Sequence, residues 1–292
     1  MTVVVPAYQA AHLLALSVPA VLALRGVEAW IWVDDGSTDG TSARLRALTR
    51  HEPRARVLTR PENEGRGAAR NAGLREVTSQ TVLFLDADVS PPPDLAEAMG
   101  VALRTGPAVA AVATLRPLPG DASDPYAAYL RYFPRGIADA AAGDRLAWRH
   151  FLTTAVGVRT SVLRDVGGFD ATVAYGEDVE LASRLAERHP EGLVACGRTV
   201  DLRGVDTLDG VLRRMRDFGR ALAQMPDRVL RTAELEVLTA PSWRRRLAAS
   251  RRGAAVVRRS LRVLPAACVA LGVRYLLAHA LVCAFDASDR PS

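Results

Sequence analysis

The residues best suited to chemistry in the first half of the chain are a pair of acids. Asp86 and Asp88 follow the apolar run Val82–Leu85. Two acids at the end of a buried strand cost stability unless something compensates them. In an extended chain their side chains would point to the same side, where they could bind one divalent cation and the phosphates that it carries. The alternative is that the pair caps a helix before Pro91.

Two further polar segments follow apolar runs. The segment Asp34–Gly40, with the sequence DDGSTDG, follows Ala29–Val33, and Pro6–Gln9 follows the first apolar run. Taken alone, the first of these segments fits a polar turn with a helix cap, because Asp, Ser, Thr and Gly favour turns and caps. Ligands of open α/β sheets bind beyond the carboxyl ends of the strands, so we expect both segments and the Asp86/Asp88 pair at one edge.

A glycine-containing segment lies between the second and third of these strand ends. Gly65 and Gly67 precede a run of small residues, which permits close approach of the backbone to a ligand. Arg66 and Arg70 could donate hydrogen bonds to a phosphate or ribose at the N-terminus of the following helix. As a glycine pattern alone, this segment is only weakly specific.

Adjacent acids also occur in the second half of the chain. Glu177 and Asp178 follow shortly after Gly167-Gly168-Phe169-Asp170. At a helix start they could simply interact favourably with the helix dipole. A carboxylate that faces a pocket could instead take a proton from a hydroxyl nucleophile. The residues by themselves leave both interpretations open.

Strand-length apolar runs alternate with helical patterns over the first 115 residues, which is typical of βαβ units with a mostly parallel sheet. Each run is continuously apolar, as expected when helices cover both faces of a sheet. The predicted strands are Thr2–Pro6, Ala29–Asp34, Arg56–Thr59, Thr81–Asp86 and Ala108–Ala113. The predicted helices are Ala11–Leu24, Thr41–Arg50, Gly67–Glu76 and Asp94–Arg104.

The pattern loosens after Pro117, resumes from about Phe151 to Val200 and is all-helical from about Asp206. Internal repeats and low-complexity linkers are absent from the sequence. We therefore expect two lobes of one domain, residues 1–115 and 116–205, and a helical, arginine-rich extension over residues 206–292.

The net charge of +6 would favour a polyanionic partner, but it is unevenly distributed. All 38 basic residues are arginine, and residues 240–292 hold ten of them against two aspartates, a local charge of +8. Residues 1–239 therefore carry −2. Aromatic residues make up only 5% of the chain, which leaves little material for base stacking, so we expect no nucleic-acid partner.

Other features bear on the compartment. The three cysteines are too few and too far apart for a metal cluster or a disulfide framework, which fits a reducing compartment. The N-terminal residues do not have the pattern of a signal peptide, so we expect a cytoplasmic protein. The apolar stretch Val263–Phe285 is interrupted by Pro265, Arg274 and His279, which favours a core or interfacial helix over a spanning one.

Paired arginines recur every seven residues near the C-terminus, at Arg244/Arg245, Arg251/Arg252 and Arg258/Arg259. The apolar residues Leu247, Ala254 and Leu261 have the same spacing, so the predicted helix has one basic and one apolar stripe. The basic stripe could be a solvated face. It could instead make peripheral contact with anionic lipid at the inner face of the cell membrane, which would suit a lipid-linked acceptor.

Six segments in order, VVVPAYQ, VDDGSTDGT, NEGRGAARNAG, FLDAD, GGFD and GEDVEL, resemble the motifs of inverting family-2 glycosyltransferases with the GT-A fold. The resemblance covers about Thr2 to Arg188, and six ordered motifs are far more specific than any one. It implies a GT-A fold with a mostly parallel central sheet. It also implies a nucleotide-diphosphate sugar donor, an acceptor hydroxyl and a divalent cation, Mn²⁺ or Mg²⁺.

The resemblance further implies roles for individual residues. The nucleotide base and ribose would be lined by Pro6, Ala7, Tyr8 and Asp35, with Arg66 and Gly67 closing over them. The DxD motif is matched by Asp86, Ala87 and Asp88, of which Asp88, assisted by Asp86, would bind the metal. The general base of the ED motif is matched by Asp178, with Glu177 beside it. The acceptor and donor-sugar site would include Gly167, Gly168 and Phe169.

The chain departs from the family pattern in places. Gln9 stands where many relatives have Asn, Val89 follows the DxD motif in place of Asp or Gly, and residues 200–204 contain no His for the metal. Arg213–Phe218 lacks the Gln and Trp of the QxxRW motif of processive relatives, so we expect one sugar transferred per encounter. Two alternatives remain: a catalytically silent binding module at a membrane, and a sugar-1-phosphate nucleotidyltransferase, which usually needs a lysine that this chain lacks.

Overall fold

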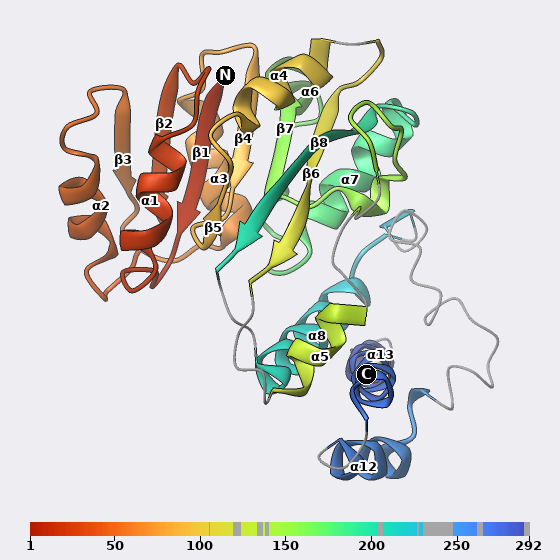
Figure 1. The fold of residues 1–292 in the computed structure, drawn as a ribbon. Helices are drawn as coiled ribbons and strands as arrows, with labels where there is room; N and C mark the ends of the chain where they lie inside the picture. Colours follow the sequence, from red (N-terminus) through yellow and green to blue (C-terminus); the bar gives the residue numbers. More distant parts are fainter. Residues whose placement is uncertain are drawn as a thin grey trace. The chain divides into compact units, whose positions relative to one another are not determined.

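The computed structural model describes residues 1–104, 106–118, 124–132, 137, 140–203, 207–226, 228–229, 248–261 and 265–288. The chain forms two compact units (Figure 1). Unit 1 comprises residues 1–116 and 136–204, and unit 2 comprises residues 117–135 and 205–292. Residues 117–135 therefore group with the C-terminal helices, whereas we expected them in the second lobe of the domain.

Within the described part of unit 1 lies an eight-stranded sheet in the order β3-β2-β1-β4-β7-β6-β8-β5. Its strands are β1 (Thr2–Ala7), β2 (Ala29–Asp34), β3 (Ala55–Thr59), β4 (Thr81–Leu85), β5 (Val89–Ser90), β6 (Ala110–Pro117), β7 (Ala155–Arg159) and β8 (Leu193–Leu202). β1 is parallel to β2 and β4, and β2 is parallel to β3. β7 is antiparallel to β4 and β6, and β5 is antiparallel to β8. The predicted α/β class with a mostly parallel sheet is confirmed.

Helices cover both faces of this sheet (Figure 1). They are α1 (Leu14–Leu22), α2 (Thr41–Thr49), α3 (Arg66–Arg75), α4 (Leu95–Arg104), α6 (Thr160–Asp165) and α7 (Glu177–Arg188), with the short 3₁₀ turn η1 (Trp148–His150). Val3 and Val5 of β1 join one apolar core with residues of α1 and α4, and Val4 joins another with residues of α3 and α7. Successive side chains of a strand point to opposite faces, which is why the strands are apolar at every position.

Every strand and helix predicted for the first 115 residues is present, with bounds shifted by four residues or fewer. The end of β4 differs in a way that affects the acid pair. The strand stops at Leu85, and residues 87 and 88 form a turn that brings β5 alongside β8. The extended geometry that we expected for Asp86 and Asp88 is therefore wrong.

The described part of unit 2 contains α5 (Pro125–Tyr132), α8 (Leu208–Leu222), α12 (Arg251–Ser260) and α13 (Ala266–Ser288). These helices share an apolar core that includes Tyr126 of α5, Val211 of α8 and Val273 of α13. Burial of Tyr126 in this core explains why α5 groups with the C-terminal helices. α8 approaches α13 closely at Gly219, where an added Cβ would lie 2.5 Å from the carbonyl oxygen of Leu281. The predicted helical C-terminal region is confirmed over the described residues.

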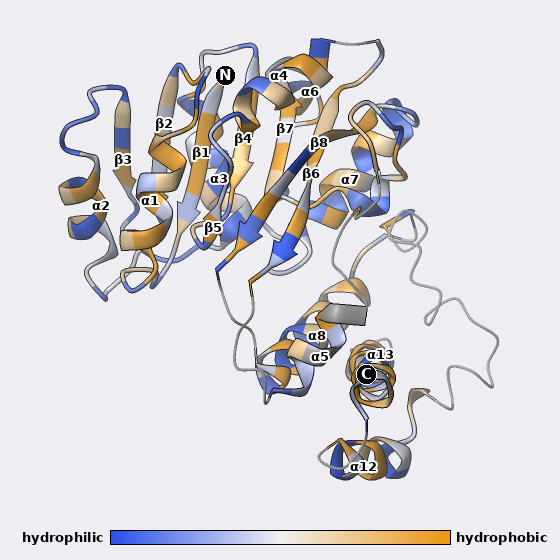
Figure 2. Cartoon of the chain, viewed as in Figure 1, coloured by the Kyte–Doolittle hydropathy of each residue, from blue (hydrophilic) through white to orange (hydrophobic). Residues whose placement is uncertain are grey.

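The two last helices differ in their hydropathy (Figure 2). α13 includes Cys268–Ser288, a segment long and apolar enough to cross a membrane by length and composition only. α12 is amphipathic as predicted, with Ala254 facing the unit 2 core and its basic residues exposed. The exposed arginines are Arg251, Arg252, Arg258 and Arg259. The predicted stripe residues Arg244, Arg245 and Leu247 lie outside the described residues.

A pair of helix glycines tests the packing of α3 on the sheet. We expect Gly73→Ala to destabilise the protein by about 1–3 kcal/mol, because the added Cβ would overlap the Cγ1 atom of Val4 in β1. Gly100→Ala in α4 is the matched control, since its Cβ would meet only the flexible end of Arg104 at 3.2 Å. Alanine favours the helix there, so we expect a gain of up to about 1 kcal/mol. Denaturant unfolding of both variants measures the difference, and equal stabilities would contradict this account of α3.

Candidate active site

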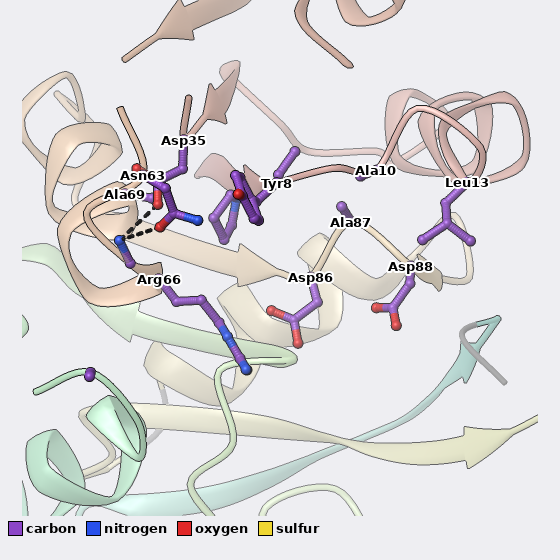
Figure 3. A pocket seen from close by; sticks show the side chains of 14 residues that line it. Tyr8, Ala10, Leu13, Asp35, Asn63, Arg66, Ala69, Asp86, Ala87 and Asp88 are labelled. Carbon is purple, nitrogen blue, oxygen red and sulfur yellow. Dashed lines mark hydrogen bonds between the residues drawn. The ribbon is translucent and has the colours of Figure 1, made fainter. Parts of the chain in front are cut away.

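A pocket of about 430 Å³ opens beyond the carboxyl ends of β1, β2 and β4 (Figure 3). This volume lies in the range of small-molecule sites. The predicted nucleotide-sugar residues that line it are Pro6, Ala7, Tyr8, Asp35, Arg66, Asp86, Ala87 and Asp88. Gly65, which we expected to allow close approach of the backbone to a ligand, also lines it. The lining residues to which we assigned no role from the sequence are Ala10, Leu13, Asn63, Ala69 and Ala174. The convergence of three strand ends at one edge is thus present in the structure.

Gly67 was expected at this pocket but does not line it. An added Cβ at Gly67 would lie 3.5 Å from the Cβ atoms of Phe169 and Glu177 and 3.4 Å from the carbonyl oxygen of Asp170. The small residue therefore lets α3 lie against the segment that leads into α7. Its role in the structure is helix packing behind the pocket.

Asp35 forms one end of the pocket and is almost fully buried. Its carboxylate accepts hydrogen bonds from Arg60 Nη1 at 2.5 Å and from the backbone N–H of Gly65 at 2.9 Å. The same N–H of Gly65 also donates to Asn63 Oδ1 at 2.9 Å (Figure 3). Asp35 therefore fixes the 63–65 loop that borders the pocket. The DDGSTDG segment is thus more than a polar turn, because its second acid organises a remote loop.

Tyr8 is 49% exposed and belongs to the pocket wall, so its ring is available to a planar ligand. The next residue, Gln9, has a φ of +50°. Its side-chain oxygen accepts from the backbone N–H groups of Thr38 at 3.2 Å and Asp39 at 3.1 Å, and its own N–H donates to Ser37 Oγ at 2.9 Å. Gln9 thereby joins the loops after β1 and β2.

The two arginines of α3 have different environments. Arg66 lines the pocket, and its guanidinium carbon lies 5.1 Å from the ring centre of Tyr175. Burial alone would lower the pKa of Arg66, but the nearby charges of Glu177 and Asp86 raise it above its usual value. Arg66 is therefore a permanent cation at the pocket, suited to a phosphate group.

Arg70 is only 1% exposed and does not border the pocket. Its Nη1 donates to Glu177 Oε1 at 2.5 Å, and its Nη2 donates to Asp86 Oδ1 at 2.9 Å. Both terminal nitrogens are therefore engaged by protein carboxylates. The expectation that Arg70 donates to a phosphate or ribose is wrong, because its charge is used inside the protein.

Asp86 and Asp88 line the pocket together, and Figure 3 shows both side chains pointing to the same side. The backbone oxygen of Asp88 accepts from Arg203 N–H at 2.8 Å, which fixes the turn against the end of β8. Among the described residues, no group of three or more His, Cys, Asp or Glu side chains could hold a metal ion. Mg²⁺-like cations commonly use one or two carboxylates plus substrate phosphates, and this acid pair fits that arrangement.

The loop Gly167–Phe169 lies beside α3 and outside the pocket lining. Asn71 holds it from both sides: its amide Nδ2 donates to the Phe169 carbonyl at 2.7 Å, and its Oδ1 accepts from the Phe169 N–H at 2.9 Å. The Phe169 ring packs edge-on against Phe84, with centroids 5.3 Å apart. Gly168 has a φ of +72°, and an added Cβ there would lie 2.6 Å from Asn71 Oδ1. Gly168 thus permits the close approach of this loop to α3, whereas an added Cβ at Gly167 would meet nothing within 4 Å.

Glu177 and Asp178 begin α7, directly after Gly176 in the left-handed conformation. Glu177 is buried in its ion pair with Arg70, whereas Asp178 is partly exposed. Loss of hydration and the charge of Glu177 raise the pKa of Asp178 to about 6. The charges of Arg70 and Arg66 oppose that rise. A carboxyl with this pKa is mostly ionised at pH 7 and can accept a proton.

Two solved structures with a similar fold hold sugar nucleotides. A mannosyltransferase from Pyrobaculum calidifontis, in complex with GDP-Man and Mn²⁺, has a TM-score of 0.63 at 19% identity and covers 98% of this chain and 87% of its own. S. aureus TarS 1–349 in complex with UDP-GlcNAc has a TM-score of 0.56 at 13% identity, with 99% and 90% coverage. The sheet, its covering helices and the pocket at the strand ends define the protein as one with the GT-A glycosyltransferase fold.

Sequence relatives agree with this class. A pre-mycofactocin glycosyltransferase of Mycobacterium tuberculosis is 35% identical over 156 residues, which are 50% of this chain and 33% of that protein. AglE of Haloferax volcanii is 28% identical over 160 residues, 53% of this chain and 50% of its own. The chain spans about a third of the length of the first curated relatives that it matches. The profile of glycosyl transferase family 2 matches residues 2–166, and the chain belongs to this family.

Proposed function

We propose that this protein transfers a single sugar from a nucleotide-diphosphate donor to an acceptor hydroxyl, with inversion at the anomeric carbon. One observation carries the proposal. The family-2 pocket joins an aromatic and carboxylate end, formed by Tyr8 and Asp35, to an end that contains Arg66 and the Asp86/Asp88 pair. The first end suits a nucleoside base and the second suits a diphosphate with its cation.

The solved relatives support a sugar-nucleotide donor, since one binds GDP-Man with Mn²⁺ and another binds UDP-GlcNAc. In this chain, Asp88 and Asp86 would hold a divalent cation, Mn²⁺ or Mg²⁺, together with the donor phosphates. When bound, the cation offsets the negative charge that grows on the leaving diphosphate. Arg66, which lines the pocket near Asp86, would bind the same phosphates.

Asp178 is the proposed general base. It would take the proton of the acceptor hydroxyl as that oxygen attacks the anomeric carbon opposite the leaving group. Glu177 is engaged by Arg70 at 2.5 Å and raises the proton affinity of Asp178. We assign acceptor and donor-sugar positioning to the Gly167–Phe169 loop, which α3 holds next to the start of α7. A single displacement of this kind inverts the configuration.

Release of nucleotide diphosphate from a panel of sugar nucleotides with Mn²⁺ tests this function. We expect Asp178→Asn to lower the rate by about 10²–10⁴-fold, because the base is lost. Asp88→Ala should lower turnover and weaken its dependence on Mn²⁺. The matched control is Glu187→Gln, which changes an exposed acid of the same helix and should leave turnover unchanged. Unaltered turnover in the Asp178 and Asp88 variants would contradict the roles assigned to these residues. Binding of a sugar nucleotide by wild-type protein without turnover would favour the catalytically silent binding module.

The pH dependence of turnover tests the base separately. Loss of hydration and the charge of Glu177 raise the pKa of Asp178 to about 6, so the reactive ionised form is lost below that pH. We expect kcat to fall about tenfold per pH unit below pH 6 and to level off above pH 7. A product-release limit is excluded by single-turnover measurements at each pH. An acidic limb near pH 4 would show that the base titrates as an ordinary, solvated carboxyl.

We also propose that α12 makes peripheral contact with anionic lipid at the inner face of the cell membrane. Exposed arginines occur on α12 beside Val256, which is 64% exposed. Each arginine near such a surface contributes about 1 kcal/mol, and an exposed apolar side chain adds to the contact. A cytoplasmic protein bound in this way would meet a lipid-linked acceptor.

Vesicle flotation tests this contact. We expect wild-type protein to float with vesicles of phosphatidylcholine and phosphatidylglycerol but not with phosphatidylcholine alone. The triple variant Arg251→Gln, Arg252→Gln and Arg259→Gln should lose about 100-fold in partitioning, from about 1 kcal/mol per charge. A control with the same net charge changes three exposed arginines of unit 1, Arg44, Arg75 and Arg104, to Gln. Equal recovery of the two triple variants in the floating vesicle fraction would contradict the proposed contact.

A further inference from the structure

Arg70 is the buried cation of this site, and it contacts three segments that are distant in sequence. Asp86 follows β4, Glu177 begins α7, and the guanidinium carbon of Arg70 lies 5.6 Å from the ring centre of Phe169. Asp86 borders the donor pocket, whereas Glu177 precedes the proposed base. One side chain therefore connects the donor side of the site to the acceptor side.

We propose that Arg70 is a positioning residue that couples the donor-binding acid Asp86 to the start of α7, so that the diphosphate site and the general base are assembled together. This inference rests on the proposed function. Arg70 touches neither the pocket nor the reacting groups, so it acts through its two carboxylate partners. The planar guanidinium donates to the two carboxylates in fixed directions, which a single ammonium group does not do.

The charges around Asp178 give Arg70 a second effect. Glu177 on the same helix favours the protonated form of Asp178, and Arg70 and Arg66 on α3 favour the ionised form. Because Arg70 lies 2.5 Å from Glu177, it offsets the negative charge nearest to the base. Removal of the Arg70 charge takes away the ion-pair partner of Glu177 and leaves only the charge of Arg66 to oppose Glu177 beside Asp178. The base would then hold its proton to a higher pH.

Asn71, the neighbour of Arg70 on α3, makes a purely geometric contact to the same region. Its amide pairs with both backbone groups of Phe169 and carries no charge. A substitution there disturbs the loop before α7 without changing the charge near Asp178. Asn71 therefore supplies the control that separates the electrostatic effect of Arg70 from structural support.

The experiment measures single-turnover rates against pH with the donor that the full-length wild-type protein turns over. We expect Arg70→Gln to reduce the rate about 100-fold at pH 7 and to move the acidic limb upward by about one pH unit. Arg70→Lys keeps the positive charge, so its acidic limb should stay at the wild-type pH although its rate is lower. In the double variant Arg70→Gln/Glu177→Gln, both charges are gone, so the limb should return close to the wild-type position. Asn71→Ala should lower the rate without moving the limb.

The inference would be overturned if folded Arg70→Gln had its acidic limb at the wild-type pH. It would also be overturned if the limb of Asn71→Ala moved to higher pH by the same amount as that of Arg70→Gln. If Arg70→Gln alone does not melt cooperatively, Glu177→Gln is compared with the double variant. The two differ only in the Arg70 charge, so the double variant should have the higher limb by about one unit, and identical limbs would overturn the inference. Absence of turnover in wild-type protein would instead count against the proposed function.

Discussion

Asp86 follows β4, a strand that is buried on both faces. Its negative charge is compensated by the guanidinium of Arg70, whose Nη2 lies 2.9 Å from Asp86 Oδ1. A buried ion without a partner costs several kcal/mol, so such pairs restrict where the attached segments can lie. Arg70 also engages Glu177, and on the other side of the pocket Asp35 engages Arg60. Ion pairs therefore fix the segments that follow β2 and β4 at the pocket.

The fold of the first 115 residues could be predicted because it depends on local pattern. The continuously apolar strands β1, β2 and β4 have no other stable place than the centre of a helix-covered sheet, and they align their carboxyl ends at one edge. The acids after β2 and β4 were therefore expected together, and they do line one pocket. The turn at Ala87 and Asp88 was missed because it depends on pairing of β5 with β8, more than 100 residues away.

The partners of the charged residues could not be predicted for a similar reason. Arg70 and Arg66 belong to one short motif with the same side-chain chemistry, yet one is buried among protein acids and the other borders the pocket. The difference arises from the position of α7, whose first residue is 107 positions from Arg70. The position of α7 also explains why we predicted a ligand contact for Gly67. In the structure, the small size of Gly67 instead allows the contact between α3 and the segment before α7.

α3 shows how packing and chemistry constrain each other in this site. On its sheet side, Gly73 lies so close to Val4 that no side chain fits between them. The same helix carries Arg70 and Asn71, which contact Glu177 and Phe169. A displacement of α3 away from β1 would therefore also displace the start of α7 relative to Asp86. The small residues of the motif thus determine the distance between Asp86 and the start of α7 as much as its charged residues do.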